Sequence, residues 1–208
     1  MRLKSIGYVF STCLLTASFL ASPAHAYVVG IAAGTRSLYL QVGAGTVTGG
    51  TVSGGGTPAN NATINSVAVT VPSANVGGGP RPMTTDSTVT NSPFDNFVFC
   101  SVPTQVYVGG FFRGPGGASV ATLSSTSPFN LTSGADAIPF SSISWVSGGN
   151  SDPVATIPSG TFNGSTQTLY TATQNTWFES CLSFVYANSA AVPAGTFSGR
   201  VIYTLSAP

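Results

Sequence analysis

Short runs of valine, threonine, phenylalanine and tyrosine recur along the chain after residue 26, and glycine, proline, asparagine and serine separate them. No apolar period of three to four residues continues long enough there to indicate a helix. The pattern is typical of an all-β protein, a sandwich or a barrel. We expect strands at 27–33, 37–48, 64–71, 97–108, 118–123, 138–146, 154–157, 167–172, 177–187 and 196–206.

The clearest alternation lies in the last of these strands. The residues of one parity are apolar: Phe197, Val201, Tyr203 and Leu205. Polar residues, among them Ser198 and Thr204, occupy the other parity. Because successive side chains of a strand point to opposite faces, we expect one buried face and one mostly polar face.

Residues 1–26 follow a different pattern. Arg2 and Lys4 precede an apolar stretch at 8–20, and the segment ends in Ala24-His25-Ala26. This is the layout of a secretory signal peptide with an A-x-A cleavage site, and it is too short to span a membrane. Cleavage would leave about 180 of the 208 residues, enough for one domain with a sizeable core and without a transmembrane segment.

Lys4 and His25 are the only lysine and histidine of the chain, and both lie in this leader. The mature chain therefore lacks the usual bases that activate a serine, threonine or cysteine nucleophile. Two carboxylates suffice for glycoside hydrolysis, and Asp95 and Glu179 are the candidates, but nothing in their spacing singles them out. We expect no enzyme activity and no cofactor.

Charge is scarce: only 5% of the residues are charged, against about a quarter in a typical domain. Without a basic patch, binding to nucleic acid is not expected. A monomer normally keeps itself soluble with charge, so a neutral surface fits a subunit that packs against neighbours. A secreted domain coated with serine, threonine and asparagine is the plainer alternative.

Cys100 and Cys181 are the two cysteines that remain after the leader, which carries Cys13. An even pair in an oxidising compartment favours one disulfide. In the chain-entropy model, closing this loop stabilises the folded state by roughly 4 kcal/mol. Both cysteines lie in apolar, aromatic segments that are expected to be buried. With no imidazole and no CxxC, no metal or redox site is predicted.

Oxygen ligands for calcium are present at Asn150, Asp152 and Asp95, but they form no repeated acidic motif and are better explained as turn residues. Trp145, Trp177, Phe111 and Phe112 could stack on sugars in a lectin-like site, although buried aromatics are the commoner use of such residues in strands.

The carboxy-terminal run Val-Pro-Ala-Gly-Thr-Phe-Ser-Gly-Arg-Val-Ile-Tyr-Thr-Leu, residues 192–205, resembles the final strand of fimbrial subunits of the chaperone–usher pathway. It is most similar to the archaic branch with its spore-coat-U-like pilins. The expected mature start, Tyr-Val-Val-Gly-Ile-Ala-Ala at 27–33, is similar to their short apolar amino-terminal extension.

The resemblance implies an immunoglobulin-like β-sandwich that lacks its last strand and is completed by the extension of the next subunit. The implied partners are identical or related subunits, a periplasmic chaperone and an outer-membrane usher. The implied location is the periplasm in transit and then a surface filament with a role in adhesion or biofilm. The expected domains are a signal peptide at 1–26, an extension with the first strand at 27–48, and the sandwich at 49–208.

Two registers are open for the donor strand. In the first, Tyr27, Val29, Ile31 and Ala33 form the inserted row, and Gly30 passes a shallow pocket. In the second, the donor is 37–48, with Leu38, Leu40 and Val42 as the inserted row. The first is favoured, because the second segment also serves well as the subunit's own first strand. In either case the acceptor groove is expected along Phe197, Val201, Tyr203 and Leu205.

The competing interpretation is a secreted, self-complete sandwich that binds a glycan through loop aromatics. It shares the fold but has a self-complete core and needs no neighbouring subunit, so a stable, soluble monomer of the purified mature protein would favour it.

Overall fold

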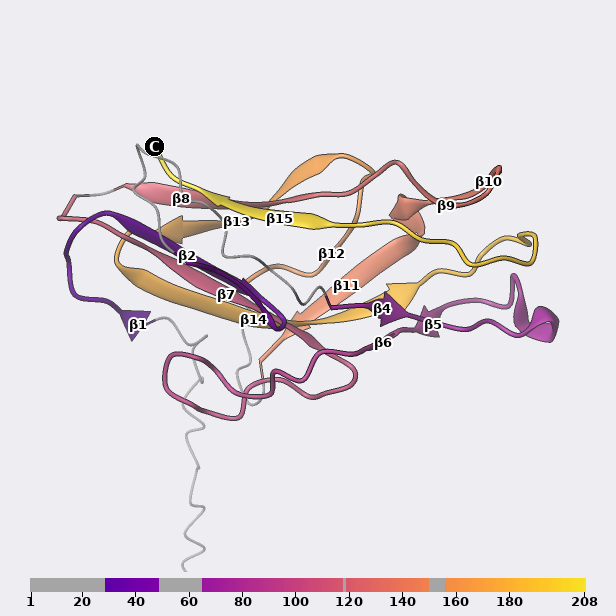
Figure 1. Ribbon diagram of the computed structural model, residues 1–208, viewed down its shortest axis with the longest axis horizontal. Helices are drawn as coiled ribbons and strands as arrows, with labels where there is room; N and C mark the ends of the chain where they lie inside the picture. The colour runs from indigo at the N-terminus through magenta and orange to yellow at the C-terminus, as the bar shows by residue number, and fades with distance from the viewer. Residues whose placement is uncertain (1–28, 49–64, 118, 150–155) are drawn as a thin grey trace, which may run out of the picture.

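The computed structural model describes residues 29–48, 65–117, 119–149 and 156–208. The expected signal peptide, Tyr27, and most of the strand expected at 154–157 lie outside the described residues. Within them the fold is an all-β sandwich of antiparallel strands, as the alternation of polar and apolar residues predicts. Figure 1 shows its two layers.

The larger sheet has the order β12-β11-β14-β7-β2-β3, and β1 and β5 pair with β14 beside this path. Its strands are β1 (Val29–Gly30), β2 (Ser37–Val42), β3 (Gly45–Thr48), β5 (Arg81–Pro82), β7 (Val106–Arg113), β11 (Ile143–Gly148), β12 (Gly160–Thr161) and β14 (Thr176–Tyr186).

The smaller sheet has the order β13-β8-β15, with β13 (Thr166–Thr173), β8 (Val120–Thr126) and β15 (Ile202–Ser206). Two short hairpins accompany the sheets: β4 (Val67–Ala68) with β6 (Thr84–Thr85), and β9 (Asn130–Ser133) with β10 (Asp136–Pro139). The helical turns η1 (Ser73–Asn75) and η2 (Phe140–Ser142) have three residues each. No helix in the described ranges has the length and apolar character needed to cross a membrane.

The main core lies between the two sheets. Its buried side chains come from alternate positions of facing strands, such as Val108 and Phe112 on β7, Leu123 on β8, and Phe178 and Leu182 on β14. Fully burying a large apolar side chain contributes about 1.5–3 kcal/mol, so this layer of contacts holds the two sheets together.

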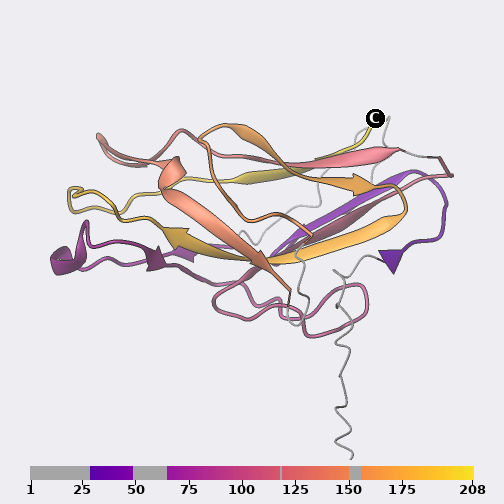
Figure 2. The same ribbon diagram turned by 180° about the vertical axis from the view of Figure 1, so that it is seen from behind.

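A second, smaller core covers the opposite face of the larger sheet. The loop at 86–105 folds across that face and brings Phe99 and Cys100 onto Tyr107, Trp177 and Cys181. In Figures 1 and 2 this loop lies below the larger sheet, on the side away from β15. Its burial explains why apolar residues occur at both parities of β14.

The predicted disulfide joins Cys100 to Cys181, with 5.5 Å between the Cα atoms. It fastens the loop at 86–105 to the middle of β14, and both cysteines are buried in the second core.

Hydroxyl groups dominate the outward face of the smaller sheet. The cross-strand register aligns Thr166 with Thr126, Thr168 with Ser124, and Thr171 with Thr122. On the other side of β8, Thr204 and Ser206 continue two of these rows, and Ile202 continues the third. None of these aligned positions carries an ionisable side chain.

Several expected strands need correction. The strand expected at 138–146 is interrupted by the turn η2 between β10 and β11. Within the described residues, the strands expected at 27–33 and 64–71 are only two residues long, as β1 and β4. The strand expected at 37–48 is a hairpin, because Gly43 adopts a φ of 55° and turns β2 back into β3. The strand expected at 97–108 begins only at Val106, since the preceding residues form the loop over the second core. The strand expected at 196–206 is regular only from Ile202.

Replacing Cys100 and Cys181 together by alanine should lower the free energy of unfolding by about 2–5 kcal/mol, because the unfolded chain regains the freedom that the crosslink removes. Denaturant titration of the variant and the parent measures this. Two free thiols in the parent protein, found by mass spectrometry without reductant, would contradict the pairing.

Candidate functional site

β15 is an edge strand of the smaller sheet. It pairs with β8 from Ile202↔Thr126 to Ser206↔Thr122, and within the described ranges no strand pairs with its other edge. An edge of this kind presents a row of backbone N–H and C=O groups to which another strand can add. This edge lies toward β2 of the opposite sheet, which β15 contacts.

The inward row of β15 is apolar but incompletely covered. Val201, Tyr203 and Leu205 pack against the main core and are only half-buried, whereas Ile202 on the outward side is 56% exposed. Burial also raises the pKa of the Tyr203 phenol. The structure therefore places three of the four expected acceptor residues together along one open edge.

Phe197, the fourth expected acceptor residue, lies apart from this row. It is half-buried and precedes β15, in the segment where Ser198 bridges to Thr132 of β9. It does not belong to the apolar residues that the structure groups with the main core.

On the facing side, β2 is part of the larger sheet. It pairs with β7 on one edge and with β3 on the other. Leu40 is buried, and Leu38 and Val42 pack half-buried against the main core. The half-buried residues of β2 and β15 therefore belong to the same core, where the two layers meet.

The expected donor segment lies beside β14, a strand in the interior of the larger sheet. Val29 and Gly30 pair with Trp177 and Thr176 of β14, and Ile31 packs half-buried against the second core. Ala33 is exposed. Thus the segment 29–33 contacts β14 of the same chain, in the layer opposite β15 (Figure 1).

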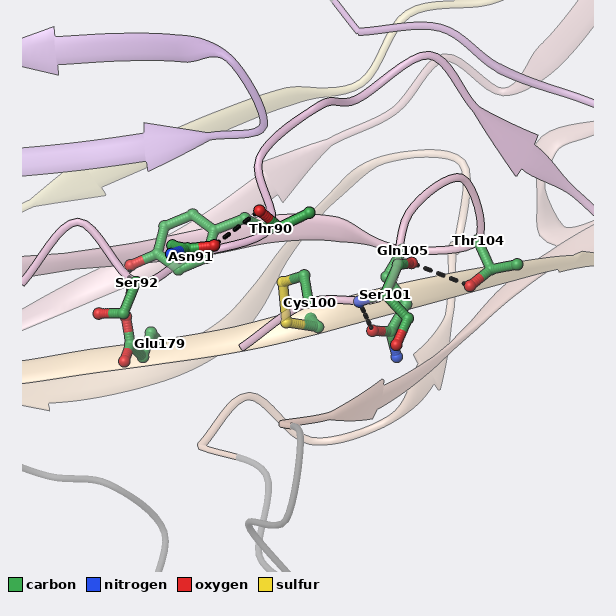
Figure 3. Close-up of a disulfide and its surroundings, with 10 residues drawn as sticks. Thr90, Asn91, Ser92, Cys100, Ser101, Thr104, Gln105 and Glu179 are labelled. Carbon is green, nitrogen blue, oxygen red and sulfur yellow. Dashed lines mark hydrogen bonds between the residues drawn. A yellow bond between two sulfur atoms is a disulfide. The ribbon is translucent and has the colours of Figure 1, made fainter. Parts of the chain in front are cut away.

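A buried carboxylate lies beside the disulfide. Glu179 is 3% exposed, and its Oε2 accepts hydrogen bonds from Ser92 Oγ at 2.8 Å and from Tyr107 Oη at 2.7 Å. Figure 3 shows Ser92 and Glu179 next to Cys100. Two hydroxyl donors compensate the loss of water that burial imposes on this carboxylate.

A glycine makes this contact possible. Tyr107 and Gly109 share one face of β7, and Gly109 lies directly opposite Glu179 in the register. A Cβ atom on Gly109 would collide with the Tyr107 hydroxyl, so the absence of a side chain lets the phenol lie across this position and reach the carboxylate.

The two carboxylates considered for catalysis occupy different environments. Asp95 is exposed, and its Oδ1 accepts a hydrogen bond from the backbone N–H of Phe97, an ordinary turn contact. Glu179 is buried under the loop. Asn150 and Asp152, considered for calcium, lie outside the described residues, and no three histidine, cysteine or acidic residues gather in the part that the structure describes.

The aromatics considered for sugar stacking belong to the cores. Trp145 and Trp177 are each 4% exposed, and Phe112 is 1% exposed. The half-buried Phe111 ring stacks on Tyr39 with centroids 5.6 Å apart. The exposed large apolar residues are others, among them Phe97 on the loop at 86–105 and Phe129 before β9.

The network of Ser92, Tyr107 and Glu179 could not be predicted from sequence patterns. Ser92 lies 87 positions and Tyr107 lies 72 positions from Glu179 in the chain. One signal was present: Gly109-Gly110 interrupts an otherwise aromatic and β-branched strand, and a glycine inside a strand often marks a close approach.

Comparison with known proteins adds no assignment, since no family model, no curated protein and no solved structure matches this chain.

Replacing Tyr107 by phenylalanine should lower the free energy of unfolding by about 1–3 kcal/mol, because a charged acceptor in a dry site loses one of its two donors. Denaturant titration measures this loss. Asp95→Asn is the matched control at an exposed carboxylate and should change stability little. A loss no larger than that of the control would contradict a structural role for the network.

The same tyrosine should make the protein sensitive to alkali. Burial, followed by the neighbouring Glu179 carboxylate, raises the pKa of Tyr107 above its ordinary value of 10.0. A group whose pKa is raised in the folded state contributes its full stabilisation below its pKa in the unfolded state. This contribution is lost as the pH rises further. The free energy of unfolding should therefore fall above about pH 10, and less steeply in Tyr107→Phe than in the parent. Equal slopes would contradict this assignment.

Proposed function

We propose that this protein is an exported structural subunit of a surface filament, and that subunits join by strand addition. Each subunit offers the open edge of β15 as the acceptor, and the next subunit supplies an extended apolar segment. Main-chain hydrogen bonds then give affinity, and alternate side chains that enter the sandwich give the register.

The state of β15 is the observation that carries this proposal. A half-buried row of Val201, Tyr203 and Leu205 beside an edge with which none of the described strands pairs is what an incomplete sandwich presents. A self-complete sandwich needs to protect such an edge, for example with charges or proline. The edge strand contains neither between Ile202 and Ser206.

The donor in this proposal is the segment 27–33. The alternative segment, 37–48, includes β2, whose removal would open the larger sheet and expose Leu40. By contrast, the ladder of β1 involves only two residues. The segment 29–33 can therefore leave its own subunit at a much smaller cost than β2.

An open apolar edge also needs protection before assembly. In this proposal a periplasmic chaperone covers the edge of β15, and an outer-membrane usher exchanges the chaperone for the donor of the next subunit. The buried disulfide is compatible with export into an oxidising compartment. The scarcity of charge supports close contact between many copies, since neighbouring subunits then repel one another little.

Ile31→Asp should leave the subunit folded but prevent filament growth, because insertion of the donor would bury an unpaired carboxylate at a cost of several kcal/mol. Ala32→Asp, at the adjacent exposed position of opposite parity, is the matched control and should assemble. Electron microscopy and sedimentation measure assembly, and circular dichroism checks that both variants are folded.

The Ile31→Asp subunit keeps its acceptor edge and should therefore cap growing filaments when mixed with the parent protein, which shortens them. Equal assembly of Ile31→Asp and the parent would eliminate this donor segment. A parent protein that remains a stable monomer without any partner would instead favour the self-complete binding module. Leu40→Asp is no test of donation, since Leu40 is buried in the subunit's own core.

A further inference from the structure

The segment that the proposed function assigns to a neighbour is held on its own subunit. Trp177 of β14 pairs with Phe111 of β7 on one edge and with Val29 of β1 on the other. β1 therefore extends the larger sheet locally on the edge of β14 opposite β7. Figure 2 shows it at the end of the sandwich, next to the β7–β14 end of that sheet.

Hydrogen bonds continue this attachment beyond the two paired residues. The Ile31 N–H donates to the Asn175 carbonyl at 2.7 Å, and the Gly34 N–H donates to the Gly114 carbonyl at 3.0 Å. Between them, Arg113 Nε donates to the Ala32 carbonyl at 3.0 Å. The guanidinium group lies so close to Gly34 that a Cβ atom there would meet it.

Packing adds to these bonds. Ile31 is half-buried against the second core, whose Trp177 is itself almost fully buried. Ile31 is also a central residue of the expected donor row. The same apolar side chain therefore has two uses that exclude each other, covering the second core of its own subunit and entering the core of the next.

From this conflict we infer that β1 and the residues up to Gly34 form an autoinhibitory clasp. Docked on β14, the clasp holds the donor segment away from other subunits, and it opens when the segment is donated. This inference rests on the proposed function. We define the clasp as residues 29–34 and its site as the Thr176–Trp177 edge of β14 with Arg113.

The clasp has the strength that such a role requires. A net hydrogen bond in water changes an equilibrium constant by roughly two- to tenfold, so a few bonds populate the docked state without fixing it. The longer ladder available along β15, with its row of apolar side chains, outcompetes a two-residue ladder. Donation therefore proceeds once an acceptor edge is present, but the free subunit stays closed.

Arg113→Gln tests the clasp, because it removes the charged donor to Ala32 without changing β15 or any residue of the donor row. Arg36→Gln is the matched control, an exposed arginine between the clasp and β2. Hydrogen exchange of the purified mature protein reports docking directly. In the parent protein the Ile31 and Gly34 amides should be protected, and Arg113→Gln should lower this protection by roughly tenfold, as expected for a hydrogen bond to a charged group.

The second measurement is the rate of filament formation, followed by light scattering and electron microscopy. Arg113→Gln should assemble several-fold faster than the parent and than Arg36→Gln, since its donor is free for longer. An unprotected Ile31 amide in the parent protein would overturn the clasp itself. Lost protection in Arg113→Gln without faster assembly would overturn its inhibitory role.

The two proposals fail in distinguishable ways. If the Ile31 amide is protected but the parent protein forms no filaments under any condition, the proposed function fails and β1 is an ordinary strand of the sandwich. If filaments form but the Ile31 amide exchanges freely in the monomer, the proposed function stands and the clasp is wrong.

Discussion

β14 is buried on both faces, and the rest of the structure depends on this constraint. Phe178 and Leu182 enter the main core, whereas Trp177, Glu179 and Cys181 enter the second core. A strand in a two-layer sandwich normally has one face on the core and one on water. Here the loop at 86–105 covers the second face. The Cys100–Cys181 disulfide, the hydrogen-bonded Glu179 carboxylate and Gly109 all belong to the contact between this loop and the sheet.

The Glu179 carboxylate and the disulfide attach this loop to β14 at two different points. Cys100 fixes one point of the loop covalently to β14, and Ser92 fixes another through Glu179. Glu179 also draws Tyr107 across Gly109, so the loop, β7 and β14 meet at a single oxygen atom. Because the contact is buried, each donor is worth more than it would be at the surface.

Much of the architecture was predictable from local pattern. The period-two alternation of Val201, Tyr203 and Leu205 correctly predicted which face of the last strand packs inward, and the cysteine pair was found by counting. The hairpin at 130–139 was missed because its residues, such as Asn130 and Pro139, have low strand propensity and depend on context. The run from Phe97 to Cys100 was wrongly predicted as a strand, because burial under a loop selects apolar residues much as a sheet does. The docking of β1 on β14 could not be predicted, since it joins residues far apart in the chain.

The outward face of the smaller sheet has a consequence for how this protein meets water. Its aligned positions carry hydroxyl and methyl groups and no ionisable group. Hydration there depends on neutral hydrogen bonds, which salt does not screen and protonation does not change. Such a face therefore gives the protein an exterior whose hydration should change little with the salt concentration or the pH of the medium.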